Sequence, residues 1–466
     1  MLKTAFRATS AVLVFALAVF GQGFSSLTGT VSDPQGAVIA GAKITLEDPT
    51  RGVSREVTSG ADGRYTLSQV PPGTYKVTAK AAGFSDVAIS NVAMAVNVAA
   101  TINIKFEKVG AVSETISVSA EGTQINTTDA TVGNAIGTKP ILQLPLFARN
   151  LASLLAFQPG VTSFAEVSGT PLDDRSGAVN GGKSDQANIT LDGVDVNQQS
   201  ARTAFTSVLR ATLDSTQEFR STTSGATADQ GRSSGAQISL VTKSGTNQFH
   251  GSGYYVRRDT RFSANTFFNN ASGVKRPPLE IQVPGGSIGG PIQKNKAFFF
   301  LNYEHRRDNS EANVSRTVPS MDMRRGTVAY LNAARQTVRL TPQDIQTRID
   351  PRGIGVSAAS LAVLQRYPEP NDFTLGDGLN IVGYRFTAPL ALRWNTYISK
   401  FDYNLDDKHS FFWRGQMQND RSIDPPQFPG QPPRIVRLNN AKGHVLGHTA
   451  LIKPTFISTF RYGLTR

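Results

Sequence analysis

The residue types that this 466-residue chain lacks already exclude several kinds of functional site. It contains no cysteine, which excludes a disulfide framework and a thiolate metal site. Only five histidines are present, none precedes His250, and no H-x-x-E zinc pair occurs. Beyond an apolar run at residues 11–20, no stretch approaches 18 apolar residues, so no transmembrane helix is predicted. The residues therefore predict no metal site, no cofactor and no catalytic centre.

Charge and composition point to a β-rich protein. The formal net charge is +13, but the 48 Lys and Arg residues are scattered along the chain. A nucleic-acid-binding protein would concentrate them in a stripe with interleaved aromatics, so no nucleic-acid partner is expected. The 42 glycines and 24 prolines favour short strands joined by turns. The fold class predicted is mainly β, in several domains.

The first segment, residues 1–23, has the pattern of a secretory signal peptide. Lys3 and Arg7 precede the apolar run at residues 11–20, and Gly21-Gln22-Gly23 follows it. A basic start, about ten apolar residues and a small-x-small site are typical of cleaved export signals. The mature chain is therefore expected outside the cytoplasm.

Residues 25–108 are predicted to form a small β-sandwich. About seven short alternating segments are separated by turn sequences such as Asp62-Gly63 and Pro71-Pro72-Gly73. Residues 29–36 (GTVSDPQG), 61–65 (ADGRY) and 70–75 (VPPGTY) resemble the carboxypeptidase-regulatory-like, transthyretin-type sandwich. The resemblance implies an accessory domain in the periplasm, not a peptidase.

Residues 109–122 form a linker that holds a candidate docking strand. Residues 113–120 (SETISVSA) alternate polar and apolar side chains, and such a segment can extend the sheet of a partner protein. The segment resembles a TonB box, which implies a TonB-type energy-coupling protein as partner. A plain linker or the last strand of the sandwich remains an alternative. The candidate TonB-box residues are Glu114, Thr115, Ile116, Ser117, Val118, Ser119 and Ala120.

Residues 123–246 are predicted to be an α+β plug domain. Leu151, Leu154 and Leu155 have helical spacing, and Pro159-Gly160 ends that pattern. Residues 144–161, 179–182, 189–195, 217–219 and 241–251 carry an ordered set of short motifs (LPL-x-x-RN, VNGG, ITLDGVD, QEF and VTKSGTNQFHG). In this order they resemble the Oar-like branch of TonB-dependent outer-membrane transporters.

Two features of the plug invite sharper interpretations. Residues 177–184 fit the spacing G-x-x-x-x-G-K-S of a phosphate-binding loop, but a strand-like segment, not a helix, follows Ser184. Nucleotide binding is therefore not expected, and Asp192 and Asp195 flank an ordinary turn. Plug loops are nevertheless candidates for the substrate face, with Asn180, Gly181, Gly182, Lys183, Asp192, Gly193 and Asp195 as residues.

Residues 247–466 are predicted to be the first strands of an incomplete transmembrane β-barrel. Aromatic-rich alternating segments occur at residues 251–257, 297–305, 395–405, 410–418, 444–452 and 457–464, and residues 308–392 are predicted as a long extracellular loop. A 22-stranded plugged barrel needs more chain than these 220 residues, so a fragment is expected. His444 and His448 would lie about 13 Å apart on a strand and could not share one ion.

The function predicted is non-enzymatic: energised uptake of an unidentified extracellular substrate by a TonB-dependent protein embedded in outer-membrane lipid. An outer-membrane adhesin or secretion accessory with the same barrel is one alternative. A soluble periplasmic β-protein is another.

Overall fold

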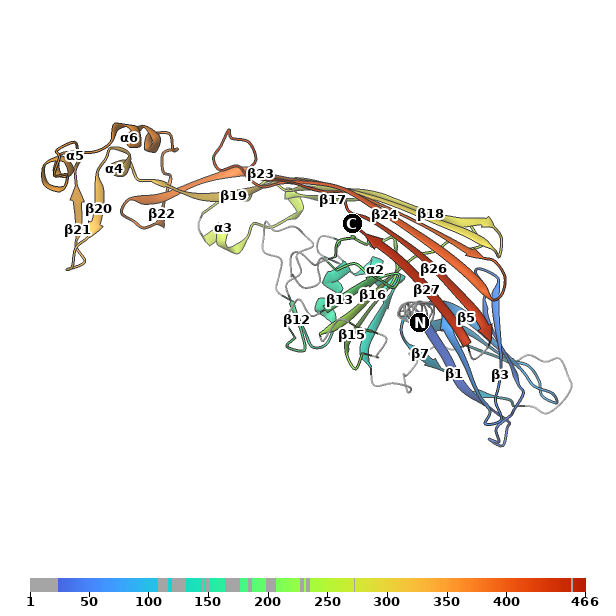
Figure 1. The fold of residues 1–466 in the computed structure, drawn as a ribbon. Coiled ribbons are helices and arrows are strands. Elements are labelled where there is room, and N and C mark those ends of the chain that lie inside the picture. The colour runs from blue at the N-terminus through green and yellow to red at the C-terminus, as the bar shows by residue number, and fades with distance from the viewer. Residues whose placement is uncertain are drawn as a thin grey trace, which may run out of the picture.

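The computed structural model describes most of the chain outside the signal segment and the interdomain linkers. The described residues are 24–107, 116–119, 131–144, 146, 149, 151–163, 177–182, 187–197, 207–226, 230–231, 235–271, 273–453 and 456–466. Residues 1–23 lie outside this set, as do Glu114, Thr115, Ala120 and Lys183. Three bodies follow one another along the chain: a sandwich, a plug and a large curved sheet that covers the plug (Figure 1).

The sandwich consists of two sheets around one apolar core, as the turn spacing predicts. One sheet has the order β4 (Arg64–Val70), β1 (Ser25–Ser32), β7 (Ala99–Thr101), with β8 (Ile104–Lys105) also paired to β1. The other has the order β3 (Val53–Thr58), β2 (Lys43–Asp48), β5 (Gly73–Lys80), β6 (Val87–Met94), β9 (Ile116–Ser119). Alternate side chains point inward, and Leu27, Ile44 and Phe106 are among the fully buried ones.

The plug is a mixed sheet with short helical segments. Its order is β10 (Val132–Gly137), β15 (Thr216–Ser224), β16 (Ala236–Thr242), β13 (Ala187–Leu191), β14 (Val194–Asp195). The small pair β11 (Val161–Ser163) and β12 (Gly177–Val179) lies apart from this sheet, and the helical segments are α2 (Thr138–Gln143) and η2 (Leu151–Phe157). Leu151, Leu154 and Leu155 are buried in the plug core, as their helical spacing predicts.

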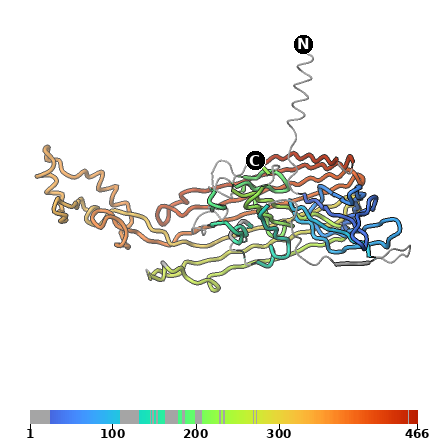
Figure 2. The backbone as a smooth tube through the Cα atoms, turned by 90° about the horizontal axis from the view of Figure 1, so that it is seen from below, coloured from blue at the N-terminus to red at the C-terminus, as the bar shows by residue number. Residues whose placement is uncertain are grey.

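The third body is an open antiparallel sheet with nine strands among the described residues. Its main path is β17 (His250–Asp259), β18 (Glu280–Gln293), β19 (Ala297–Pro319), β23 (Ile381–Asn404), β24 (His409–Ile423), β26 (Lys442–Lys453) and β27 (Phe456–Thr465), with β22 (Asp372–Gly376) and β25 (Val436–Asn439) beside it. The sheet curves around the plug on one side (Figures 1 and 2). This confirms the predicted class of a sandwich, a plug and part of a barrel.

The loop predicted over residues 308–392 is shorter than expected. Residues 308–319 of β19 pair in unbroken register with residues 381–392 of β23, so both ends of the predicted loop are strand. The sequence hides this because the buried apolar residues of this ribbon, such as Val314, Val318 and Val382, are interrupted by polar and charged residues. The remaining tip holds α4 (Met321–Arg324), β20 (Val328–Leu331), β21 (Thr337–Leu340), α5 (Pro342–Asp344), η5 (Ile345–Ile349) and α6 (Ala358–Gln365), and it protrudes far from the plug (Figure 1).

The connections differ in length at the two ends of the sheet. At the end near the sandwich, residues 294–296 and 405–408 join successive strands. At the opposite end the connection from β17 to β18 contains η4 (Thr260–Phe262) and α3 (Phe267–Ala271), and the long tip follows β19.

No helix among the described residues is long and apolar enough to cross a membrane.

Candidate functional site at the plug–barrel interface

The plug touches the inner face of the curved sheet through polar side chains, and we call this surface the plug–barrel interface. Strand alternation decides which barrel residues reach it. In β19, β23 and β24, for example, Asn302, Lys400 and Arg414 are buried on the inner face, whereas their sequence neighbours Tyr303, Phe401 and Trp413 belong to the outer face. The apolar core of the plug is nearly self-contained, with Ala441 as its one buried member from the sheet.

The turn Asp192-Gly193 carries the plug carboxylate that lies deepest in this interface. It joins β13 to β14 as a two-residue hairpin, in which Leu191 pairs with Val194. Both turn residues have positive φ, 51° and 79°, which is the geometry of a type I′ turn. Asp and Gly are residues that tolerate this geometry, so the local sequence favours the turn that carries Asp192.

Two barrel cations and a plug threonine surround the Asp192 carboxylate. Arg414 Nε lies 3.1 Å from Oδ2 and Lys400 Nζ lies 3.6 Å from Oδ1. Thr242 donates from its backbone N–H at 3.0 Å and from its hydroxyl at 2.9 Å. Burial raises the pKa of Asp192, but Lys400, Arg414 and the hydrogen bonds from Thr242 outweigh it and hold that pKa below its ordinary value. The carboxylate is therefore ionised at neutral pH.

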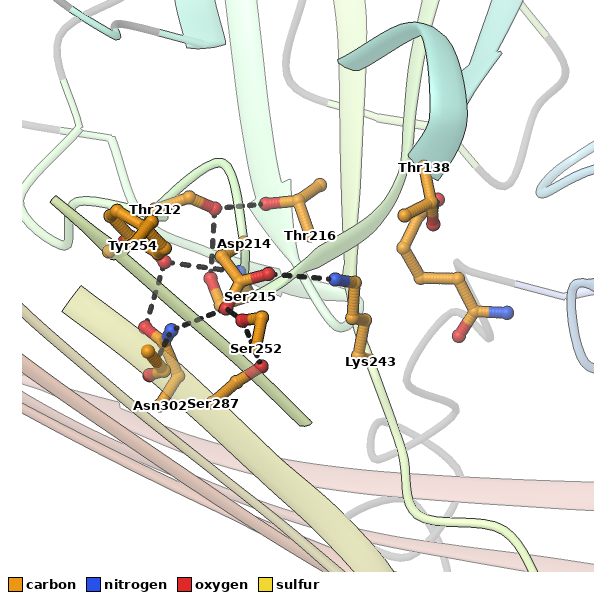
Figure 3. A network of polar contacts seen from close by, with 12 residues as sticks. Thr138, Thr212, Asp214, Ser215, Thr216, Lys243, Ser252, Tyr254, Ser287 and Asn302 are labelled. Atoms are coloured by element: carbon orange, nitrogen blue, oxygen red, sulfur yellow. Dashed lines mark hydrogen bonds and ion pairs between the residues drawn. The ribbon is translucent and has the colours of Figure 1, made fainter. Parts of the chain in front are cut away.

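A second polar network centres on Asp214 of the plug (Figure 3). Lys243 of the plug lies 3.3 Å from one carboxylate oxygen, and Ser252 of β17 donates to the other at 2.6 Å. Asn302 of β19 donates to the same oxygen at 3.4 Å and accepts from Thr212 at 2.8 Å. Burial raises the pKa of Asp214, but the serine hydrogen bonds and Lys243 lower it to a net value below the ordinary one.

In two further ion pairs of the interface the plug supplies the cation, an arginine, and the barrel supplies the carboxylate. Arg149 lies 3.2 Å from Glu304 of β19, which also accepts from the Tyr254 hydroxyl at 2.7 Å.

The second, Arg210, lies 2.7 Å from Asp420 of β24 and stacks over the Trp394 ring at 3.8 Å from its centroid. Gln416 and Gln418 donate to the backbone carbonyls of Arg210 and Val208, at 2.6 and 3.2 Å. Plug and barrel thus each supply both signs of charge.

The sandwich contacts the plug at the end where the connections are short. The Glu218 carboxylate of β15 accepts from the backbone N–H of Val96 at 2.8 Å, and Gln217 donates to the carbonyl of Pro72 at 3.1 Å. Burial raises the pKa of Glu218 to about 7, against the smaller lowering effects of that hydrogen bond and of Arg220. This carboxyl group therefore changes charge within the physiological pH range.

A cavity of about 110 Å³ lies where sandwich, plug and barrel meet. Asp192, Lys400 and Arg461 are among the residues that line it. Its size allows a few water molecules and no larger solute.

The predicted substrate-face residues divide into two groups. Asp192 is 5% exposed and lies inside the interface with Gly193 beside it, while Asp195 accepts hydrogen bonds from Asn197 at 2.8 and 2.7 Å within the plug. Asn180 and Gly181 form an exposed turn, where Asn180 donates to the Thr223 carbonyl at 2.8 Å and Gly182 follows. Lys183 is outside the described residues. A substrate face remains a prediction for the turn at residues 180–182, whereas Asp192 is enclosed by the barrel.

The described residues of the phosphate-loop motif form strand and turn. β12 covers Gly177–Val179, a turn follows, and β13 begins at Ala187. The four residues between Gly182 and Ala187 leave no room for the helix that a phosphate loop requires. His444 and His448 both lie on β26, and the described residues contain no cluster of three or more His, Asp or Glu that could hold a metal ion.

The candidate TonB-box segment is described only in its middle. Ile116–Ser119 form β9, which pairs in parallel with β6 from Val87 to Ser90. The segment is therefore an added strand on the edge of the sandwich in this conformation, which is the arrangement named above as an alternative.

Sequence reasoning missed the barrel partners of the plug. Lys400, Arg414, Asp420 and Glu304 belong to no recognisable motif. Each of these residues is a charged residue that strand alternation places on the inner face. This pattern can be recognised only once the strand register is known.

Comparisons with known proteins agree with this architecture. Residues 241–466 match a family model described as an outer membrane beta barrel domain, and residues 26–107 match a carboxypeptidase regulatory-like domain. The chain therefore carries an N-terminal carboxypeptidase-regulatory-like domain and, in its C-terminal part, residues that match an outer-membrane β-barrel domain.

Among curated proteins it is similar to the TonB-dependent transporter Oar of Myxococcus xanthus, with 24% identity over 313 residues, or 63% of this chain and 28% of that protein. The match spans under a third of that relative's length. Similar solved structures include the outer-membrane transporter YddB of Escherichia coli (TM-score 0.46, 12% identity, 71% of this chain and 38% of that chain). Another is the ferric enterobactin receptor PfeA of Pseudomonas aeruginosa (TM-score 0.41, 12% identity, 73% and 41%). These relatives are transporters and receptors, not enzymes.

Proposed function

We propose that this chain supplies the coupling domains and the plugged part of the barrel of a TonB-dependent outer-membrane transporter. The observation that carries the proposal is the plug–barrel interface, a small globular domain held in a barrel wall by buried ion pairs and amides. Ionic and amide contacts can be exchanged for water when the plug shifts, whereas the apolar plug core stays intact. The polar contacts would therefore hold the plug in the barrel and still allow it to move.

The two ends of the sheet give the orientation in the membrane. Outer-membrane barrels have short periplasmic turns and longer extracellular loops. The end with short connections is also where the sandwich docks, since Asn247, just before β17, donates to the Thr50 carbonyl at 2.9 Å. The sandwich and β9 then face the periplasm, and the long tip faces the outside.

In this arrangement the coupling protein would act on the segment from Glu114 to Ala120. β9 already makes the kind of contact that such docking uses, because it adds a strand to a sheet edge through main-chain hydrogen bonds. A TonB-type protein would compete with β6 for this strand. Release of β9 would be the first step of coupling.

Binding of the purified periplasmic domain of TonB to the outer-membrane protein that contains this chain tests the proposal. The double variant Ile116→Pro with Val118→Pro should abolish binding, because proline removes the N–H groups that pair strands. The matched variant Ser117→Ala with Ser119→Ala should retain it, since the main chain carries the affinity. Equal binding by both variants would refute coupling through this segment and favour the adhesin or secretion alternative.

A further inference from the structure

Three arginines stand directly opposite one another on the outer face of the sheet. Arg307 of β19 is the register partner of Arg393 of β23, and Arg393 is the register partner of Arg421 of β24. All three side chains are exposed. We call this row the arginine belt.

The direction of the belt follows from strand alternation. Arg306 and Asp308, which flank Arg307, are 7% and 9% exposed on the inner face. Trp394 and Asp420, the neighbours of Arg393 and Arg421, contact Arg210 of the plug. Since successive strand residues point to opposite faces, the belt points away from the plug, toward the membrane surroundings.

The belt has no counter-charge of its own. Arg307 donates to the side-chain oxygen of Asn309 at 3.4 Å, and none of the three arginines forms an ion pair within the described part of the chain. Like charges directly opposite each other on neighbouring strands destabilise a sheet. Cross-strand side chains start about 5 Å apart, within the screening length of about 8 Å at physiological salt, so an anion bound at the belt would offset the repulsion.

The height of the belt indicates which anion is available. On the same outer face, the aromatic pair Tyr303 and Tyr397 stacks at 4.8 Å between ring centroids, four residues closer to the periplasmic end. Four strand residues span about 13 Å, and strands in such barrels tilt by about 40°. The ten residues from Ala297, next to the short turn, to Arg307 rise about 25 Å at that tilt, which is the height of the apolar band of such barrels. The belt therefore stands at the outer edge of that band, at the level of lipid headgroups, and the tyrosine pair lies about 10 Å inside it.

We propose that the arginine belt binds the phosphate groups of phosphorylated lipids in the outer leaflet. Guanidinium groups match phosphate in a bidentate way, and three in a row would span the phosphates of one bisphosphorylated headgroup or of two adjacent lipids. The inference depends on the membrane orientation given above and not on transport. Its failure would leave uptake and TonB binding untouched.

The test measures binding of the purified outer-membrane protein to detergent micelles that contain bisphosphorylated lipid A or its dephosphorylated form. The wild-type protein should prefer the phosphorylated lipid. The triple variant R307Q/R393Q/R421Q should bind it roughly 100-fold more weakly, because each basic residue near an anionic surface contributes about fivefold. Neutralising Arg325, Arg352 and Arg366, three exposed arginines of the protruding tip, removes the same charge elsewhere and should change nothing.

A conservative variant separates geometry from charge. R307K/R393K/R421K keeps the net charge and should lose only part of the affinity, since lysine cannot bind phosphate in a bidentate way. Heat-modifiable mobility in electrophoresis reports whether each variant folds. The proposal is overturned if folded wild-type protein does not distinguish the two lipids, or if the glutamine variant binds the phosphorylated lipid as tightly as wild type.

Discussion

Replacing Asp192 with asparagine tests whether buried charge holds the plug in the barrel. Asparagine has the shape of aspartate, keeps an oxygen that can accept from Thr242, and tolerates the left-handed backbone of the turn. It removes only the negative charge. Lys400 and Arg414, 8% and 0% exposed at their side chains, would then remain buried without a counter-ion.

The expected loss of stability follows from that burial. Breaking a buried ion pair by removing one partner costs about 3–5 kcal/mol, because the remaining charge is left uncompensated. Arg414 keeps its charge in the variant, because a guanidinium group does not deprotonate in proteins. We therefore expect a loss of about 3 kcal/mol. Lys400→Met should cost less, since Arg414 still pairs with Asp192, and the double variant should cost less than the sum of the two.

Urea unfolding of the plug within the detergent-solubilised protein measures this loss, with hydrogen exchange of the β13 and β16 amides as the local probe. Glu369→Gln, at an exposed position of the protruding tip, is the matched control and should shift nothing. A change below about 1 kcal/mol for Asp192→Asn at pH 7 would refute the reasoning, because it falls in the range of surface ion pairs.

The pH dependence gives an independent check on the same carboxylate. The folded pKa of Asp192 lies below the ordinary value of 3.8. Its contribution should therefore be fully present above pH 3.8 and be lost as pH falls through the lower folded value. The wild-type plug should lose this contribution in acid, and Asp192→Asn should lack that part of the acid sensitivity.

Three further predictions concern neighbouring contacts. The pKa of Glu218 is raised from 4.5 to about 7 in the folded protein. The free energy of unfolding of the wild-type protein should therefore fall by up to about 3 kcal/mol as pH rises from 4.5 to 7. Urea titrations of Glu218→Gln should lack this pH dependence. Arg210→Lys should weaken the ion pair with Asp420 and the stacking on Trp394, costing about 1–2 kcal/mol and shifting Trp394 fluorescence. Gly463→Val should loosen the plug in limited proteolysis, since even a Cβ there would lie 2.3 Å from Val194 Cγ1.

The class of fold could be predicted from the sequence because its signals are local. Turn residues mark the sandwich, and alternation marks the membrane strands. The ends of the strands are harder to predict from the sequence. β19 and β23 continue beyond the aromatic band as a two-stranded ribbon, where the buried apolar positions, such as Val314, Val318 and Val382, are too scattered to mark strands by alternation.

The candidate site could be predicted only on the plug side. The residues Asp192-Gly193 predict a turn. They do not predict whether the Asp192 carboxylate contacts water or cationic side chains. That depends on Lys400 and Arg414, more than 200 residues away, and on a register that joins Lys400 to Arg414 across two strands. Such pairing is set by the whole sheet, and short-range patterns do not encode it.

The sandwich and the polar interface together define how a pull could reach the plug. A force on β9 acts first on its pairing with β6, and from the sandwich it passes to the plug through the hydrogen bond from Val96 to Glu218. Those contacts are few and end at an ionisable group, whereas the plug sheet is continuous from β10 to β14. The weakest links therefore lie outside the plug core, so under load the sandwich should detach or the interface should open before β13 and β16 separate. The plug is therefore expected to move as an intact body, because the apolar contacts are concentrated within its own core.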